Sequence, residues 1–274
     1  MKKYLSMLLV LALCLSFFAL TACGSKDSVV IDQPADETTQ ADSEESAEKA
    51  AAEETEAAEE PEQEEVPTVN IFFTLASAGQ LMVVQEPLRV YDADGDGIIA
   101  INDALILGHD SWYEGCSEAG YATEDSDYGL AITKLWGVEN GGSYGYYVNN
   151  AMAYGLTDAL NEDDSLYAFS YEDLENWSDC YSYITGEVVY AEDGTAAYEG
   201  TVTYLGYDES WNIVETPLAG AQIAVNGEAS GDAVTDENGA FSVSLAESGS
   251  YTITASSDDM ILVPPVSHFD FTVG

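Results

Sequence analysis

Basic residues are rare in this chain. Its 274 residues contain 6 lysines and arginines against 51 aspartates and glutamates, which gives a formal net charge of −45 at pH 7. After residue 66 the only basic residues are Arg89 and Lys134. Binding to nucleic acid depends on lysine and arginine contacts to phosphates, so the sequence excludes nucleic acid as a partner. The same negative field raises the local concentration of cations.

Side chains suited to catalysis are also few. The two histidines are His109 and His268, and histidine is the side chain best suited to proton transfer near neutral pH. His109 closes a short helical pattern, where a cationic ring would suit the helix dipole, and His268 lies in an expected strand, so we interpret both as structural. No phosphate-binding glycine loop or nucleophile elbow is present. We therefore predict that the protein is not an enzyme.

Cysteine is scarce as well, with four residues in the chain. Cys14 belongs to the apolar N-terminal stretch and Cys23 follows it, which leaves Cys116 and Cys180. In an exported protein such a pair most simply forms one disulfide, which would stabilise the fold by about 3–5 kcal/mol. The alternative is two separate thiols. The cysteines show no zinc-binding spacing.

The strongest chemical signal is the twelve-residue segment from Asp92 to Asp103. A calcium loop supplies oxygen ligands from positions 1, 3, 5, 7 and 12 and has glycine at position 6 for a sharp turn. These positions are occupied, in order, by Asp92, Asp94, Asp96, the carbonyl of Ile98, and Asp103, with Gly97 at the turn. We predict that they bind calcium (Ca²⁺). The alternative is an acidic turn without a metal.

The residues around this loop resemble one half of a dockerin module, itself of EF-hand type. The segment Leu88–Tyr91 has the pattern of a strand, where a complete EF-hand has an entering helix. Apolar spacing after the loop predicts a helix that starts near Ile101 and that Gly108 can end. The resemblance extends from Val90 to about His109 and implies a loop-and-helix unit that calcium orders.

The N-terminus predicts export and attachment to a membrane. Residues 1–22 combine a basic start, an apolar stretch from Leu5 to Leu20 and small residues before Cys23, as in a secretory signal peptide. The segment Leu20–Gly24 resembles the bacterial lipoprotein signature, which implies that Cys23 is lipidated. An ordinary cleaved signal is the alternative. We expect an extracytoplasmic, lipid-anchored protein on the bacterial cell surface.

Residues 23–66 are predicted to form a disordered linker. From Ser25 to Val66 there are sixteen acidic residues, two lysines and no aromatic residue. Such a segment cannot bury enough apolar surface to offset the entropy of ordering, and its charges repel one another. It would act as a tether.

Two folded modules are predicted beyond the tether, at 67–185 and 186–274. The first begins with strands at 69–75 and 81–84 around a turn at 77–80. A later strand with the sequence Tyr146-Tyr147-Val148-Asn149 lies between a glycine turn and an acidic turn. This order is similar to the transcobalamin C-terminal-like domain over Val69–Tyr183. The resemblance implies an α+β module, a small mixed sheet with a short helix, and in relatives the fold helps to bind cobalamin.

The second module has short alternating strands separated by turns, which predicts an all-β sandwich. A Gly-Ala strand at 220–225 and the segment Thr235-Asp236-Glu237-Asn238-Gly239-Ala240-Phe241 resemble carboxypeptidase regulatory-like and collagen-adhesin B-type domains. The resemblance implies a spacer or binding surface without a catalytic role.

Four aromatic residues of the first module are candidates for ligand binding: Trp136, Tyr144, Tyr146 and Tyr147. Strand alternation predicts that Tyr144 and Tyr146 share one face and that Tyr147 lies on the other. Such rings either stack on sugars or flat ligands or pack in the sheet core, and the sequence leaves both open. We predict a calcium-binding surface protein acting in attachment, display or ligand binding, with a surface protein or glycan as partner. The alternative is a solute-capture lipoprotein for a corrinoid or glycan.

Overall fold

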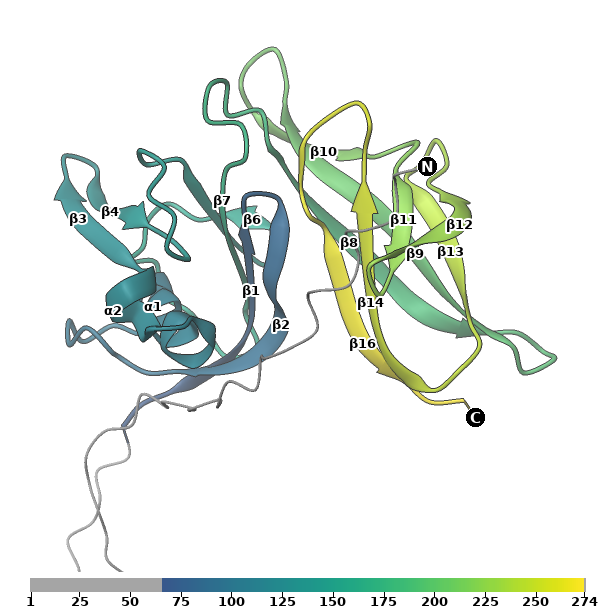
Figure 1. Ribbon diagram of the computed structural model, residues 1–274, viewed down its shortest axis with the longest axis horizontal. Helices are drawn as coiled ribbons and strands as arrows, with labels where there is room; N and C mark the ends of the chain where they lie inside the picture. The colour runs from purple at the N-terminus through teal and green to yellow at the C-terminus, as the bar shows by residue number, and fades with distance from the viewer. Residues whose placement is uncertain (1–65, 274) are drawn as a thin grey trace, which may run out of the picture. The chain divides into compact units, whose positions relative to one another are not determined.

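The computed structural model describes residues 66–273, and within this range the chain is mostly β-structure. It has sixteen strands and two helices there. Figure 1 labels most of them. Residues 66–273 belong to one compact unit. The predicted signal peptide at 1–22, the lipidated Cys23 and all of the predicted linker except Val66 lie outside the described residues.

The first sheet is built on the hairpin of β1 (Val69–Ser77) and β2 (Gln80–Val90). The predicted turn between them is confirmed, and Ala78 and Gly79 both adopt positive φ there, at 47° and 73°. The sheet also contains β5 (Tyr144–Val148), β6 (Ala151–Met152) and β7 (Ser165–Ser170). The spatial order is β2, β1, β7, β5, β6, with β1 parallel to β7 and the other pairs antiparallel.

Helix α1 (Ile101–Trp112) packs on this sheet, and the short α2 (Cys116–Gly120) follows it. The ring of Phe73 on β1 stacks on Trp112 at a centroid distance of 5.8 Å. The predicted helix end at Gly108 is wrong. A Cβ atom at Gly108 would lie 2.7 Å from the Phe73 ring, so this glycine allows close packing of the helix on the sheet and does not end it. Within residues 66–273, neither helix has the length and apolar character needed to span a bilayer.

A separate hairpin of β3 (Ala122–Ser126) and β4 (Gly129–Lys134) follows the helices. Its apolar residues join the core of the first sheet and α1. The fully buried members of that core are Ile71, Phe73, Leu75, Val90, Ile101, Ala104, Leu105, Leu135, Leu156, Leu166 and Ala168.

Two further sheets face a common core, as in a β-sandwich. One contains β10 (Ile213–Pro217), β9 (Ala196–Tyr207), β8 (Cys180–Tyr190) and β15 (Leu262–Val263), with β13 (Ala240–Leu245) also paired to β9. The other has the order β12 (Glu228–Val234), β11 (Gln222–Val225), β14 (Gly249–Ser256), β16 (Val266–Phe271). Val202, Ile223 and Ile253 are completely buried between them. The predicted module boundary at 185/186 falls inside β8.

A third core cluster joins residues of the first sheet to residues of β8 and β16. The ring of Tyr147 stacks on Tyr181 at 3.7 Å. The hydroxyl of Tyr167 donates a hydrogen bond of 2.6 Å to the carbonyl of Pro264. The two halves of the described chain therefore share buried surface.

Candidate functional site

The aspartate loop lies between the end of β2 at Val90 and the start of α1 at Ile101. Asp92, Asp94 and Asp96 each offer a carboxylate oxygen, and these oxygens lie within 4.8 Å of one another. Calcium takes oxygen ligands at about 2.3–2.6 Å, so one ion fits between three oxygens at this spacing. Gly97 has φ of 92°, which only glycine adopts readily. The sharp turn predicted at position 6 is therefore present.

Backbone amides of the loop orient all three of these carboxylates. The amides of Gly95 and Gly97 donate to the two oxygens of Asp92 at 2.7 and 2.9 Å. The amide of Asp96 donates to Asp94 Oδ1 at 3.1 Å, and the amide of Ile98 donates to Asp96 Oδ1 at 2.8 Å. Each carboxylate oxygen has a second lone pair, so these bonds fix the carboxylates and leave capacity for a cation.

Asp103 ties the loop to the start of the helix. It is 1% exposed, and its Oδ1 accepts hydrogen bonds from the amides of Ala93 and Asp94 at 2.7 and 3.2 Å. Its Oδ2 accepts from the amide of Ala100 at 2.8 Å, as an acidic residue in the first turn of a helix does. Burial raises the pKa of Asp103, the three amides lower it, and the charge of Asp94 raises it. The structure does not place Asp103, the expected ligand at position 12, with the three clustered carboxylates.

The carbonyl of Ile98, the expected ligand at position 7, accepts no hydrogen bond in the described part of the chain. The residues just after it are bound to the segment 156–160. Leu160 donates its amide to the carbonyl of Ile99 at 2.9 Å, and Asn102 donates its amide to Leu156 at 2.9 Å. These bonds hold the end of the loop against a second segment of the fold.

Two residues that were not predicted from the sequence form a chain of hydrogen bonds to the carboxylate of Asp94. The side-chain amide of Asn102 donates to Asp94 Oδ2 at 2.7 Å. The hydroxyl of Tyr121 donates to Asn102 Oδ1 at 2.8 Å. Both side chains are more than nine-tenths buried, and burial raises the pKa of Tyr121. Asn102 lies next to the expected ligand Asp103, but nothing in the sequence indicates that Tyr121 reaches it.

His109 lies in the last turn of α1 and is completely buried. Its Nε2 accepts a hydrogen bond from the amide of Trp136 at 3.0 Å, so the ring proton is on Nδ1, which donates to the carbonyl of Leu105 at 2.6 Å. Burial lowers the pKa of His109 to about 4. The expected structural role fits these contacts. The expected positive charge is wrong, because the ring is neutral at pH 7.

The aromatic candidates for ligand binding divide between two locations. Tyr144 and Tyr146 line a groove of about 520 Å³. Tyr147 faces the opposite side of β5, as alternation predicted, and is buried against Tyr181. Trp136 packs against the rings of His109 and Tyr113 and is not part of the groove lining.

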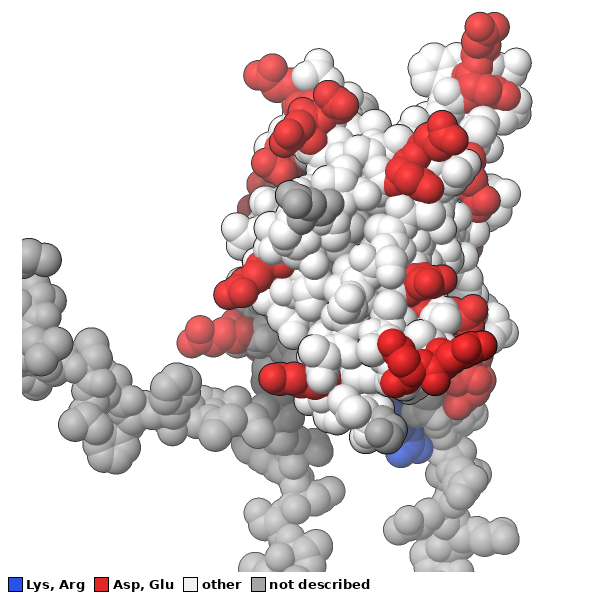
Figure 2. All heavy atoms as spheres, turned by 90° about the vertical axis from the view of Figure 1, so that its right-hand side faces the viewer, with Lys and Arg blue, Asp and Glu red and all other residues white. Residues whose placement is uncertain are grey.

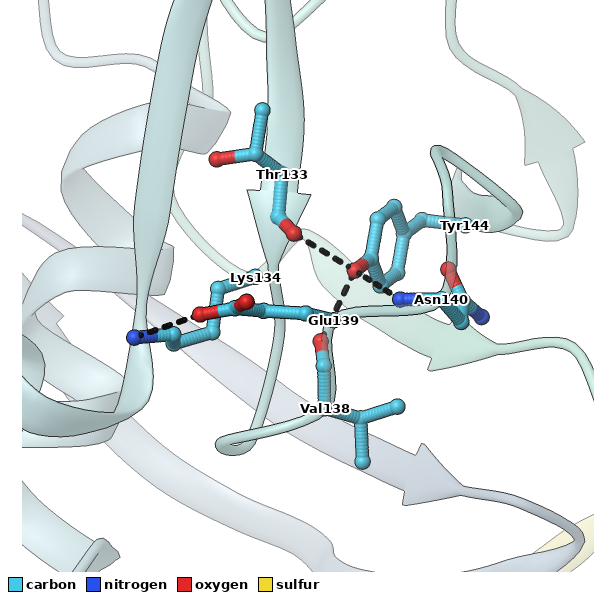
Figure 3. A network of polar contacts seen from close by, with 6 residues as sticks. All are labelled: Thr133, Lys134, Val138, Glu139, Asn140 and Tyr144. Carbon is cyan, nitrogen blue, oxygen red and sulfur yellow. Dashed lines mark hydrogen bonds and ion pairs between the residues drawn. The ribbon is translucent and has the colours of Figure 1, made fainter.

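The hydroxyl of Tyr144 is held by three backbone groups (Figure 3). Its oxygen lies 2.8 Å from the carbonyl oxygens of Thr133 and Val138 and accepts a hydrogen bond from the amide of Asn140 at 3.2 Å. Beside it, Lys134 forms an ion pair of 3.0 Å with Glu139. The hydroxyl is thus fully used by the protein, and the half-buried ring packs partly against the core of the first sheet.

Two tyrosines of the groove were missed by sequence reasoning. Tyr128 and Tyr154 both line it, and their side chains are completely exposed. They lie in turns, Tyr128 between β3 and β4 and Tyr154 after β6. Their only signal in the sequence is an aromatic residue next to glycine in a turn.

The predicted disulfide between Cys116 and Cys180 is absent, because Cys180 carries a free thiol. Cys180 begins β8, where its amide donates to the carbonyl of Ile261 at 2.8 Å. Cys116 begins α2, where its amide donates to the carbonyl of Tyr113 at 3.0 Å. The two residues are therefore fixed by different parts of the fold.

No protein-family model, curated protein or solved structure matches this chain.

Proposed function

We propose that the protein is a lipid-anchored, extracytoplasmic calcium-binding protein that acts in attachment, display or ligand binding. The observation that carries the metal assignment is the convergence of Asp92, Asp94 and Asp96, whose oxygens lie within 4.8 Å of one another. They alternate along a turn that glycine makes possible, and neighbouring amides hold all three in place.

Calcium fits this set of donors better than other common metals. The candidate ligands are carboxylate oxygens and the backbone carbonyl of Ile98, without imidazole or thiolate, so a hard cation is favoured over zinc or copper. Calcium accepts a flexible shell of six to eight oxygens that includes water, whereas magnesium requires a near-ideal octahedron. The short loop provides only part of the shell, and water would complete it.

The proposed role of calcium is structural. Three carboxylates within 4.8 Å repel one another, and a divalent cation would neutralise this repulsion and fix the connection between β2 and α1. Binding to the folded state alone stabilises it by about 2.7 kcal/mol when free calcium is 100 times its Kd. For a unit of this size that corresponds to roughly 5–10 °C in melting temperature.

The test is thermal unfolding of the chain from Gln63 to Gly274, in calcium and in chelator. We expect the parent to melt several degrees higher in calcium. The double variant Asp92→Asn/Asp94→Asn should melt at the same temperature in both. The control Asp258→Asn/Asp259→Asn removes the same charge from an exposed turn in the other half of the chain and should respond to calcium like the parent. A parent melting temperature that ignores calcium would refute the structural role.

Membrane attachment through Cys23 is proposed from the N-terminal sequence. Its test is fractionation of cells that express the full chain. The parent is expected in the membrane fraction and a Cys23→Ser variant in the soluble fraction. If both variants fractionate alike, the lipid anchor is wrong.

The finer fold assignment remains a proposal as well. A transcobalamin C-terminal-like α+β module at 67–185 is supported by the mixed sheet with α1 packed on it. A regulatory-like sandwich at 186–274 is supported by the two sheets that follow. We propose that neither module is catalytic, since both ring nitrogens of His109 are bound within the first module and those of His268 contact the hydroxyls of Ser250 and Thr252 in the second.

The second candidate function is capture of a corrinoid or glycan. One observation favours it, the groove lined by Tyr144 and Tyr146. Titration of the chain from Gln63 with cobalamin and with oligosaccharides tests it, and saturable binding of either would support capture.

A further inference from the structure

Three segments that are distant in the sequence form the groove. They are the β3–β4 hairpin, the residues 141–146 that lead into β5, and the turn at 154–157. The groove encloses about 520 Å³, which is within the range of small-molecule sites in proteins. We call it the tyrosine groove after Tyr128, Tyr144, Tyr146 and Tyr154, which all line it.

The tyrosine groove presents aromatic surface to solvent. Tyr128 and Tyr154 gain nothing from burial, because their side chains are completely exposed. Tyr144 is fixed through its hydroxyl, as Figure 3 shows. A tyrosine ring provides a large contact area at low entropic cost, with an apolar face and a polar edge. Exposed and fixed rings around one groove are suited to a ligand that has flat apolar faces.

Glycine keeps one side of the groove open. Gly141 and Gly142 have φ of 80° and 97°, so this tight turn favours glycine. A Cβ atom on either residue would meet nothing within 4 Å. The space in front of this turn is therefore left free for a ligand.

The polar and charged groups of the lining indicate which ligand charge the groove can accept. Glu124 is the only charged residue in the lining. The lining contains no lysine, arginine or histidine. Lys134, one residue beyond the lining, is paired with Glu139. The side chains of Glu124, Thr133 and Thr157 have no hydrogen-bond partner among the described residues. The lining offers no positive charge to pair with an anionic ligand. It offers one carboxylate and two hydroxyls that can form hydrogen bonds with a ligand rich in hydroxyls.

Nearly all the charged side chains on the face drawn in Figure 2 are acidic. With a formal net charge of −45, the whole chain repels anionic polymers. The charge of the molecule and the lining of the groove thus exclude the same ligands.

We infer that the tyrosine groove binds an uncharged oligosaccharide, whose rings stack on the tyrosines while its hydroxyls bond to Glu124, Thr133 and Thr157. This inference rests on the proposed function in that it names the ligand class of the ligand-binding role. It does not depend on calcium, so the two are tested separately.

The experiment is calorimetric titration of the chain from Gln63 to Gly274 with an array of neutral oligosaccharides, including cello-, malto-, xylo- and N-acetylglucosamine hexamers. Oligogalacturonate is the anionic comparison, and chitosan hexamer and choline are the cationic ones. The expected result is saturable binding of at least one neutral glycan and none of oligogalacturonate. Tyr128→Ala and Tyr154→Ala should each weaken binding about three- to tenfold. Both residues are fully exposed, so the fold should tolerate the changes.

The matched control is Tyr190→Ala, which removes an exposed tyrosine from β8 and should leave affinity unchanged. Three outcomes would overturn the inference. They are no saturable binding of any neutral glycan, binding that the two groove variants do not weaken, and preferential binding of choline or chitosan. A separate calcium titration without sugar reports on the metal site, so failure of one proposal is distinguishable from failure of the other.

Discussion

Acidification from pH 7 to pH 5 should destabilise the fold through one side chain, His109. In the folded chain, burial lowers its pKa to about 4 from the ordinary value of 6.5. The unfolded chain therefore binds a proton below pH 6.5, whereas the folded chain does so only near pH 4. The stability contributed by the neutral ring is present above pH 6.5 and is lost as the pH falls toward 4.

The magnitude follows from these two pKa values. Between pH 7 and pH 5 the free energy of unfolding should fall by about 2 kcal/mol. The contacts give the reason, because Nε2 accepts the amide proton of Trp136 and Nδ1 donates to Leu105. A proton added to Nε2 would face the N–H of Trp136 and remove that bond.

The assay is urea denaturation of the chain from Gln63 to Gly274 at several pH values from 5 to 7, with calcium chelated throughout. His109→Gln should be less stable at pH 7 but should lose most of the pH dependence. His268→Gln, which changes the exposed histidine on β16, should retain the slope of the parent. Equal slopes for the parent and His109→Gln would refute the assignment of a buried neutral ring.

Three further predictions concern stability and reactivity. Asp103→Ala leaves three loop amides without their acceptor and should cost about 2–4 kcal/mol in urea denaturation, and a loss below about 0.5 kcal/mol would contradict its role. Gly145→Ala would place a Cβ atom 2.3 Å from the ring of Phe169 and should cost about 1–3 kcal/mol. Gly249→Ala has open space around it and should cost little, so equal losses for the two glycine variants would argue against the packing shown. Burial raises the pKa of Cys180, so its alkylation at pH 8, followed by mass spectrometry, should be slower in the folded chain than in urea, and equal rates would contradict this.

Much of the aspartate loop was accessible from sequence because its signal is local. The spacing of Asp92, Asp94 and Asp96 around glycines defines a turn whose carboxylates converge, and this needs no distant contact. The role of Asp103 was not accessible in the same way. Its oxygens bind amides at Ala93 and Ala100, and that geometry depends on how the loop closes against the helix.

Gly108 and His109 show the limit of local patterns. A glycine after an apolar helical stretch is a common end signal, but Gly108 is instead required by the close approach of the Phe73 ring. A histidine near the end of a helix is usually favoured as a cation. His109 is instead completely buried, and its Nε2 accepts a hydrogen bond from the amide of Trp136. In both cases a contact with a residue more than 20 positions away decides the outcome.

Of the tyrosines that line the groove, only the two on β5 were candidates from sequence. Strand alternation correctly separated Tyr144 and Tyr146 from Tyr147. Tyr128 and Tyr154 lie in turns, where no periodicity indicates a direction, and they reach the groove only because three segments fold together.

The central claim is that the loop from Asp92 to Asp103 binds calcium. Isothermal titration of the metal-free chain from Gln63 to Gly274 with CaCl₂ tests it most directly. We expect saturable binding of one ion per chain, and its abolition in Asp92→Asn/Asp94→Asn. The absence of saturable heat, with no calcium retained in elemental analysis after dialysis against a calcium-containing buffer, would contradict it.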